Sequence, residues 1–278
     1  MYRFLLTPRW LGYLAVTLIA AVVMVELGNW QLDRYRARSE INARIDAADH
    51  AVPVELPQAL PRPGGEPGTV GPPPSGEAEW TRVTVTGRYD TANTVLVRNR
   101  SVNGRVGFEV LVPLVLTDGP AVLVSRGWVP PPAGAGAMVQ PDVPEPPVGE
   151  VTVVGRLRRP NQAEDPVTRE HGLLETRRIA LASIAAHLPY PIYGGYVMLD
   201  TEDPPASTAL VPIPVRHENS WQNLGYVAQW WIFAGMTLVG FGWFAHREAR
   251  ERQQANRADQ HRVDRTDRVD TDRVNGHR

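Results

Sequence analysis

Two apolar runs, one near each end of the chain, limit what this sequence can fold into more than any other feature. The first covers residues 10–27 and contains one acidic residue, Glu26, whereas the second covers residues 227–245 and contains no formal charge. Each run is close to the roughly 20 residues with which a helix crosses about 30 Å of hydrocarbon. Neither run has the polar face of a helix that packs on a soluble core. The sequence therefore predicts two transmembrane helices.

The first run has a second interpretation, a cleaved signal peptide, because Arg3 and Arg9 precede it. No small-x-small cleavage pattern follows the run, and the chain continues as Glu-Leu-Gly-Asn-Trp-Gln. This continuation favours an anchor that is retained in the mature protein.

The distribution of arginine around the second run predicts its orientation. Four arginines follow it, at positions 247, 250, 252 and 257, against a single Arg216 shortly before it. The positive-inside rule then places the C-terminus in the cytoplasm. With two spans the N-terminus lies in the cytoplasm as well, and the segment between the spans lies outside it. We therefore expect a multi-pass protein of the cell membrane.

Composition divides the rest of the chain into segments. Residues 28–52 are rich in good helix formers, residues 53–76 are dominated by proline and glycine and predict a mobile linker, and the end of the chain repeats arginine and aspartate. The expected organisation is a cytoplasmic N-terminus (1–9), a transmembrane helix (10–27), a juxtamembrane helix (28–52), a linker (53–76), a β domain (77–220), a transmembrane helix (221–245) and a disordered cytoplasmic tail (246–278).

The middle of the chain has the alternating pattern of β-strands. Residues 106–130 form two apolar runs around Asp118-Gly119, a strong signal for a hairpin, and both arms are apolar enough to lie in the middle of a sheet. Further strands are expected at 82–90, 94–100, 151–159, 193–200 and 209–215, with a short helix at 179–188. The predicted fold class is an α+β membrane protein, in which two transmembrane helices flank an extracytoplasmic, antiparallel β-rich barrel or sandwich.

Charge, cysteine and motif content exclude several functions. The formal net charge is −1, which gives no argument for binding nucleic acid. The chain has no cysteine, so thiolate metal sites and disulfides are excluded. No nucleophile elbow, phosphate loop or dinucleotide fingerprint is present, and the seven histidines are scattered. We expect neither an enzyme nor a metal site.

Polar and aromatic residues gather where each span meets the outer surface. Trp30, Gln31 and Arg34 follow the first span, and the second begins with the set Asn223, Tyr226, Gln229 and Trp230. Aromatic residues are ordinary interface anchors, and simple anchoring is the alternative explanation. Amides inside an apolar span are costly, so Gln229 is expected to face protein, a ligand or the partner helix. The sequence predicts a functional site at this boundary.

Six stretches of the sequence are notable in chain order: LGNWQLDR after the first span, GRYD at 87–90, GFEVLVPL, VLVSRGWVP, GRLRRP at 155–160 and NLGYVAQWW at 223–231. Together they resemble the signature segments of the Surfeit locus protein 1 family, assembly factors of cytochrome c oxidase. The resemblance covers about residues 27–244. It implies a protein without enzymatic activity that helps to insert haem a into oxidase subunit I, with subunit I and haem a synthase as partners.

The resemblance also implies a transient haem a site, for which the family uses a histidine at the outer start of the second span. This chain has Asn223 at that position, and asparagine is a poor iron ligand. His217, six residues upstream, is one replacement. The other is a site without an iron ligand, in which Arg34 and Arg126 pair with the haem carboxylates. In either case we expect a cleft between the two helices, lined by Trp30, Tyr226 and Trp230, with Gln31 and Arg34 at its rim.

A second hypothesis is a scaffold that works without haem and docks on subunit I through the β domain. Arg126, Gly127 and Trp128 are the candidate contact residues in this case. The alternative for these three residues is structural, with glycine allowing a sharp bend at a strand end and tryptophan covering the core.

Overall fold

The computed structural model describes residues 3–134, 136, 139–206, 208 and 210–275. The chain divides into two compact units, a helix pair (Met1–Glu40 with Glu218–Arg278) and a β domain (Ile41–His217). Helix α1 (Pro8–His50) contributes residues to both units, and helix α4 (Trp221–Asn275) belongs to the helix pair. Within the described residues, these are the two helices that are long and apolar enough to cross a membrane.

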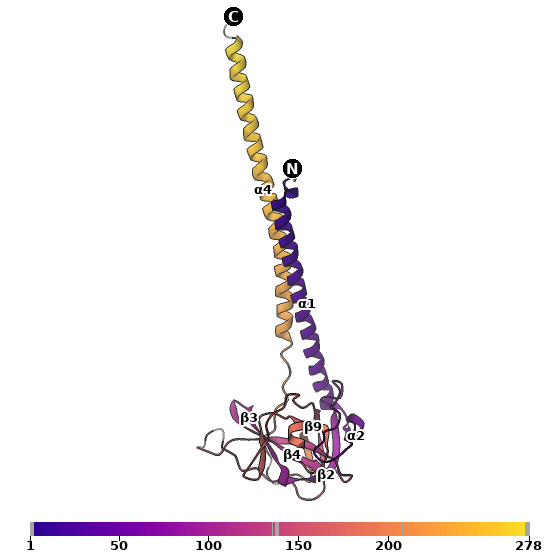
Figure 1. Ribbon diagram of the computed structural model, residues 1–278. Coiled ribbons are helices and arrows are strands. Elements are labelled where there is room, and N and C mark those ends of the chain that lie inside the picture. The colour runs from indigo at the N-terminus through magenta and orange to yellow at the C-terminus, as the bar shows by residue number, and fades with distance from the viewer. Residues whose placement is uncertain (1–2, 135, 137–138, 207, 209, 276–278) are drawn as a thin grey trace. The chain divides into compact units, whose positions relative to one another are not determined.

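In the helix pair, α1 and α4 lie side by side and run in opposite directions (Figure 1). Thr237 of α4 contacts Met24 of α1. Further along α4, the ring of Phe241 lies 6.0 Å from that of Trp10, which comes earlier on α1, so the two helices are antiparallel. A short 3-10 helix, η1 (Arg3–Leu6), precedes α1.

A buried seam joins the two helices, and small residues form much of it. Ala21 and Gly28 are buried on α1, seven residues apart, and Val227 and Ala234 are buried with the same spacing on α4. A seven-residue repeat keeps one stripe of a helix facing its partner. Small side chains let two helix backbones approach closely where lipid supplies no hydrophobic driving force.

Helix α4 continues well past the second apolar run, to Asn275. Its backbone is helical where the sequence predicts a disordered tail, and residues 276–278 of that tail lie outside the described residues. Residues 246–275 contain no glycine or proline. The ion pairs Arg247–Glu251 (2.8 Å) and Arg252–Glu248 (2.9 Å) have the i,i+4 spacing that supports a helix.

The described part of the β domain contains a nine-stranded sheet. Its strands are β1 (Val54–Glu55), β2 (Arg82–Tyr89), β3 (Val95–Val102), β4 (Arg105–Val115), β5 (Ala121–Val129), β6 (Val151–Arg158), β7 (Thr168–Glu170), β8 (Leu173–Thr176) and β9 (Ile192–Asp203). They are ordered β1-β2-β6-β9-β5-β4-β3-β8-β7, and β2 also pairs with β4. The predicted hairpin, β4 and β5, lies in the middle of this order.

The sheet is mixed, so the expectation of an antiparallel sheet was wrong. The pairs β1–β2, β3–β8 and β5–β9 are parallel. Strand β5 pairs with β4 on one edge and with β9 on the other, and strands β6, β7 and β8 lie between β5 and β9 in the sequence. Parallel neighbours need such a long connection, but a long connection also separates the antiparallel pair β2–β6, and alternation within each strand carries no information about direction. Residues 210–215 form no strand, and Val211 makes a single bridge to Trp128, because Pro212 and Pro214 lack the N–H that a ladder needs.

The proline- and glycine-rich segment 53–76 packs against the sheet, and the expectation of a mobile linker does not describe it. It contains β1 and a short helix, α2 (Leu56–Ala59), and the side chains of Leu56 and Leu60 are fully buried in the core. The carbonyl oxygens of Gly71 and Pro72 lie against Gly194 of β9, where a Cβ atom would collide with them. A few apolar anchors and one glycine-permitted close approach are enough to hold a segment whose composition is typical of a linker.

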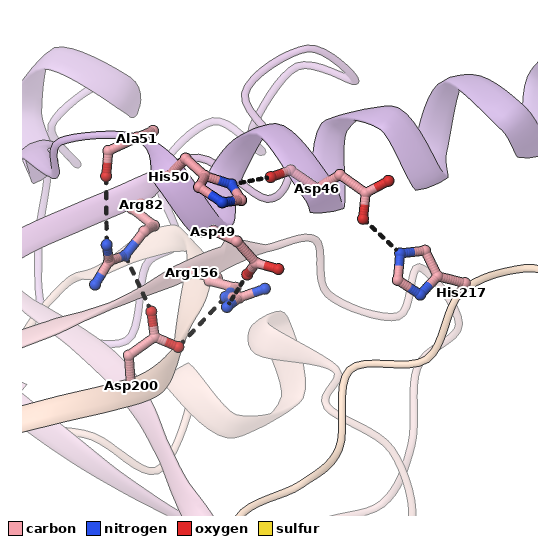
Figure 2. A network of polar contacts seen from close by, with 8 residues as sticks. All are labelled: Asp46, Asp49, His50, Ala51, Arg82, Arg156, Asp200 and His217. Carbon is pink, nitrogen blue, oxygen red and sulfur yellow. Dashed lines mark hydrogen bonds and ion pairs between the residues drawn. The ribbon is translucent and has the colours of Figure 1, made fainter.

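Two further short helices, η2 (Thr91–Asn93) and α3 (Leu181–Ala185), complete the β domain, and α3 lies within the expected range 179–188. Ion pairs fix the last turn of α1 to the sheet, as Figure 2 shows. Arg156 of β6 pairs with Asp49 of α1 at 2.6 Å and with Asp200 of β9 at 3.3 Å, and Arg82 of β2 reaches Asp200 at 3.2 Å.

Candidate functional site on the helix pair

One buried amide, that of Asn223, joins the two helices near the start of α4. The guanidinium of Arg38 donates to Asn223 Oδ1 at 2.8 Å, and Asn223 Nδ2 donates to Gln31 Oε1 at 2.7 Å. Arg38 also donates to the backbone carbonyl of Asn219 at 3.1 Å and lies 3.8 Å from the carboxylate of Glu218. We call Asn223, Gln31 and Arg38 the clasp.

The clasp closes the seam at the level where the sequence predicts a cleft. Asn223 is 8% exposed, and both ends of its amide have a partner. A buried polar group that is fully hydrogen-bonded fixes the register of the elements that it joins, because a shift would leave its partners unsatisfied. The first role that the geometry gives Asn223 is therefore to align α1 with α4.

An exposed flank lies beside the clasp. Arg34 and Tyr226 each precede a seam residue by one position, Tyr35 on α1 and Val227 on α4. In an antiparallel pair of helices such positions lie on the same side of the seam. Trp30, one turn before Arg34 on α1, is 54% exposed and Tyr226 is 41% exposed. We call Trp30, Arg34 and Tyr226 the flank.

Within the flank, the guanidinium of Arg34 lies over the ring of Trp30, 5.4 Å from its centroid. This is a cation–π contact, and both side chains are exposed. In the part of the chain that the structure describes, Arg34 has no carboxylate partner. The flank thus presents two aromatic rings and an available guanidinium to the surroundings. This combination suits a planar or apolar molecule that carries an acid group.

The other predicted residues of the second span lie in different environments. Trp230 is half-buried in the seam, and its ring lies 6.2 Å from that of Phe233. Gln229 is exposed on α4 and does not face the partner helix. The amide that faces α1 is Asn223, six positions before Gln229, so the expectation that Gln229 faces the partner helix was wrong.

His217 belongs to the β domain and is engaged there. Its Nε2 atom lies 2.8 Å from Asp46 Oδ1, near the end of α1 (Figure 2). This contact engages one ring nitrogen, and a histidine that is held in this way by a carboxylate can still coordinate a metal through its other nitrogen, Nδ1. The role of His217 as an iron ligand therefore stays a prediction. Among the described residues, no group of three or more histidine, aspartate and glutamate side chains is arranged to hold a metal ion.

Arg126, Gly127 and Trp128 lie within the β domain, in contacts with the rest of the domain. The guanidinium of Arg126 pairs with Glu202 at 3.1 Å, and Trp128 Nε1 donates to the carbonyl of Arg100 at 2.8 Å. Gly127 has a φ of 144°, and a Cβ atom there would lie 2.7 Å from Leu210. Both flanking side chains are buried, which favours the structural interpretation of this motif over a partner contact. It also removes Arg126 as a cation for haem carboxylates.

The buried pair of Arg126 and Glu202 includes a third group. Tyr89 Oη donates to Glu202 Oε2 at 2.9 Å, and its ring lies under the Arg126 guanidinium, 5.4 Å from it. Burial, reinforced by the neighbouring Glu202 carboxylate, raises the pKa of Tyr89 far above its usual value. The phenol therefore stays protonated and serves as a fixed donor.

Sequence reasoning did not identify Arg38, which completes the clasp. The signal was present, because Met24, Gln31 and Arg38 are spaced by seven residues and share one stripe of α1. Two neighbouring arginines, Arg34 and Arg36, have similar surroundings in the sequence. The arginine that faces α4 can be told from the other two only when it is known which positions of α1 lie in the seam.

Comparison with known proteins places this chain in a family. The model of the SURF1 family matches residues 18–235, a range that contains the clasp, the flank and the whole β domain. A SURF1-like protein of Mycobacterium tuberculosis is 34% identical over 255 residues, which cover 90% of this chain and 89% of the relative.

More distant relatives match shorter parts of the chain. A SURF1-like protein of Dictyostelium discoideum is 30% identical over 112 residues, 40% of each chain. The protein of Saccharomyces cerevisiae named cytochrome oxidase assembly protein SHY1 is 25% identical over 109 residues, 39% of this chain and 25% of its own length. The family match covers part of each candidate membrane helix and the whole domain between them, and this chain belongs to the SURF1 family.

Proposed function

We propose that this chain is a membrane-anchored assembly factor for a cytochrome c oxidase that contains haem a. The observation that carries the proposal is membership of the SURF1 family over residues 18–235, together with the oxidase-assembly name of the yeast relative. Helices α1 and α4 supply the two membrane anchors. The proposal assigns no catalytic step to the chain.

The proposed topology places both termini in the cytoplasm and the β domain outside the cell membrane. Its support is the excess of arginine after the second apolar run, in the four residues Arg247, Arg250, Arg252 and Arg257. The clasp and the flank then lie at the outer membrane boundary, where the haem–copper subunit of an oxidase is accessible from the same side.

The finer proposal is that the chain assists the insertion of haem a into oxidase subunit I, with haem a as a transient cargo. Haem a combines an apolar body and tail with two carboxylates. The rings of Trp30 and Tyr226 offer apolar contact on the flank, and Arg34 offers a cation for a carboxylate. Haem a synthase is the proposed donor and subunit I the proposed acceptor.

The residues at the clasp do not fit an iron ligand. Asn223 is an amide, and its oxygen and nitrogen are already hydrogen-bonded to Arg38 and Gln31. We therefore propose that haem a contacts the flank without coordination by Asn223. A cargo held by ring contacts and one ion pair leaves more readily than one held by a metal–ligand bond.

The test is a strain that lacks the gene, examined by reduced-minus-oxidised difference spectra of its membranes. The proposal expects selective loss of the a-type oxidase band, with the b-type and c-type bands unchanged. An unchanged a-type band would rule out a role in assembly of this oxidase.

A scaffold that works without haem is the second candidate, and the closed seam at Asn223 favours it. In this case the β domain docks on subunit I and holds it open for haem that other proteins deliver. The absorption spectrum of the purified chain, from cells that make haem a, separates the two candidates. Haem in the wild-type chain that is lost in Trp30→Ala supports the carrier. Absence of haem from preparations that retain subunit I supports the scaffold.

A further inference from the structure

A groove opens between α1 and α4 at the end of the pair remote from the clasp. Its volume is about 700 Å³, and aromatic side chains form its walls, among them Trp10 and Tyr13 of α1 and Phe241 and Phe244 of α4. The family resemblance draws attention to the outer boundary, and none of the motifs that carry it lies at this end. The groove is therefore separate from the clasp and the flank.

Small residues explain why the seam opens here. Thr17 of α1 and Gly240 of α4 line the groove, and no atom lies within 4 Å of the position that a Cβ on Gly240 would occupy. At Gly28, near the clasp, a Cβ would collide with the ring of Trp231. Gly28 therefore allows close packing of the helices near the clasp, whereas at Gly240 the missing side chain leaves open space.

The groove runs along the helix pair, and its charged lining residues lie at one end. It extends along α4 from Met236 to Glu251, and 15 residues of helix span roughly 22 Å. The hydrocarbon of one membrane leaflet is about 15 Å deep, half of the thickness of the bilayer core. An acyl chain can therefore follow the apolar part of the groove, while the charged end lies at the level of the headgroups.

The charged end carries both signs. Arg247, Glu248 and Glu251 line it, and Arg247 Nε donates to Glu251 Oε1 at 2.8 Å. A guanidinium has five N–H donors and a carboxylate has about four acceptor sites, so this contact leaves capacity on both groups. Glu248 also accepts from Arg252 Nε at 2.9 Å, so each glutamate at this end has one arginine beside it. A surface that presents cations and carboxylates side by side complements a headgroup that contains both a phosphate and an ammonium group.

We propose that this groove is a binding site for a zwitterionic phospholipid of the phosphatidylethanolamine type. The phosphate pairs with Arg247, the ammonium group pairs with Glu248 and Glu251, and one acyl chain lies against Gly240 and the aromatic walls. The inference rests on the proposed membrane anchoring by α1 and α4. It does not depend on the role in oxidase assembly.

The first experiment tests the apolar part of the groove. The full-length chain is purified from membranes in a mild detergent, and bound lipid is identified and counted by native mass spectrometry. Gly240→Leu fills the groove, and Gly235→Leu is the matched control, because Gly235 is equally open but does not line the groove. We expect one phosphatidylethanolamine per chain in the wild type and the control, and a roughly tenfold lower occupancy in Gly240→Leu.

The second experiment tests the charged end, with the chain reconstituted in vesicles of phosphatidylethanolamine and phosphatidylglycerol. Arg247→Gln is expected to lower retention of both lipids, while Arg250→Gln, outside the groove, leaves retention unchanged. The double variant Glu248→Gln/Glu251→Gln is expected to shift the preference towards phosphatidylglycerol, because Arg247 then faces a phosphate without competing carboxylates.

Three results would overturn the site. They are equal lipid content in Gly240→Leu and Gly235→Leu, a preference of the wild type for phosphatidylglycerol, and retention of a partner helix in place of lipid. Membrane fractionation separates this failure from failure of the anchoring itself. A wild-type chain that is in the membrane but has no selected lipid contradicts only the lipid site, whereas a chain absent from the membrane contradicts the anchoring.

Discussion

The helix pair and the β domain bury polar groups in different ways. In the helix pair the buried side-chain polarity that joins the two helices is concentrated in Asn223 and its two partners. In the β domain it is distributed over separate ion pairs on neighbouring strands. These are Arg126–Glu202 (3.1 Å), Arg100–Glu109 (2.9 Å) and Arg98–Glu175 (3.5 Å).

The difference follows from what holds each region together. The β domain has three clusters of buried apolar residues, and the hydrophobic effect there stabilises the fold enough to tolerate buried charge. The helix pair has small residues along its seam, and with the proposed membrane anchoring lipid surrounds it, so close packing and one hydrogen-bonded cluster set its alignment. Substitutions in the β domain should therefore change the stability of the fold, and substitutions in the helix pair should change alignment and function.

The largest effect is expected from breaking the buried ion pair of the β domain. Arg126→Ala leaves the carboxylate of Glu202 buried without its cation, and we expect the free energy of unfolding to fall by about 3–5 kcal/mol. Urea unfolding of the full-length chain in detergent measures this change. Arg62→Ala removes an exposed pair with Asp118 and is the control, with an expected loss of about 0–1 kcal/mol. Equal losses in the two variants would contradict the account of the β domain.

A smaller effect is expected where the proline- and glycine-rich segment meets the sheet. Gly194→Ala places a methyl group against the backbone carbonyls of Gly71 and Pro72, which cannot rotate away. We expect a loss of about 1–3 kcal/mol in the free energy of unfolding. Gly64→Ala, in the same segment but with open space around its Cβ position, is the control. If both variants unfold like the wild type, the segment is a mobile linker after all.

The smallest effect of the three is expected at the clasp. Asn223→Ala removes two hydrogen bonds between α4 and α1, and hydrogen bonds between membrane helices contribute about 0.6 kcal/mol each on average. Because the chain has no native cysteine, a disulfide between Met24→Cys and Thr237→Cys reports helix alignment without background.

We expect the Asn223→Ala change to slow formation of this disulfide by roughly threefold to tenfold. Gln229→Ala, at the exposed amide, should leave the rate unchanged. A larger effect of Gln229→Ala than of Asn223→Ala would mean that α4 is rotated about its axis so that Gln229, and not Asn223, faces α1.

Most of the strands could be predicted because their pattern is local. Val83 and Val85 alternate with polar residues in β2, and Asp118-Gly119 marks the turn between β4 and β5. The parallel pairing of β5 with β9 could not be predicted, because it depends on the path of a long connection. The packing of Leu56 and Leu60 was hidden for another reason, since two isolated leucines among prolines carry no periodic signal.

The types of residue at the candidate site could be predicted, but the directions in which their side chains point could not. The sequence identifies an amide and aromatic cluster at the outer boundary, and the structure brings Trp30, Gln31, Arg34, Asn223 and Tyr226 to one level of the helix pair. The sequence does not indicate which amide faces the seam, because that depends on the rotation of each helix about its axis. Spacing by seven from Gly28 and from Val227 fixes this rotation once the seam is known.

The central claim is that the exposed flank of the helix pair serves oxidase assembly, and complementation of the deletion strain tests it most directly. The strain receives either the wild-type gene, the double variant Trp30→Ala/Arg34→Ala, or the control Trp243→Ala, which removes an exposed tryptophan from the other end of the pair. At equal amounts of protein in the membrane, we predict that the double variant fails to restore the a-type band, while the wild type and the control restore it. A full a-type band in the double variant would contradict the account.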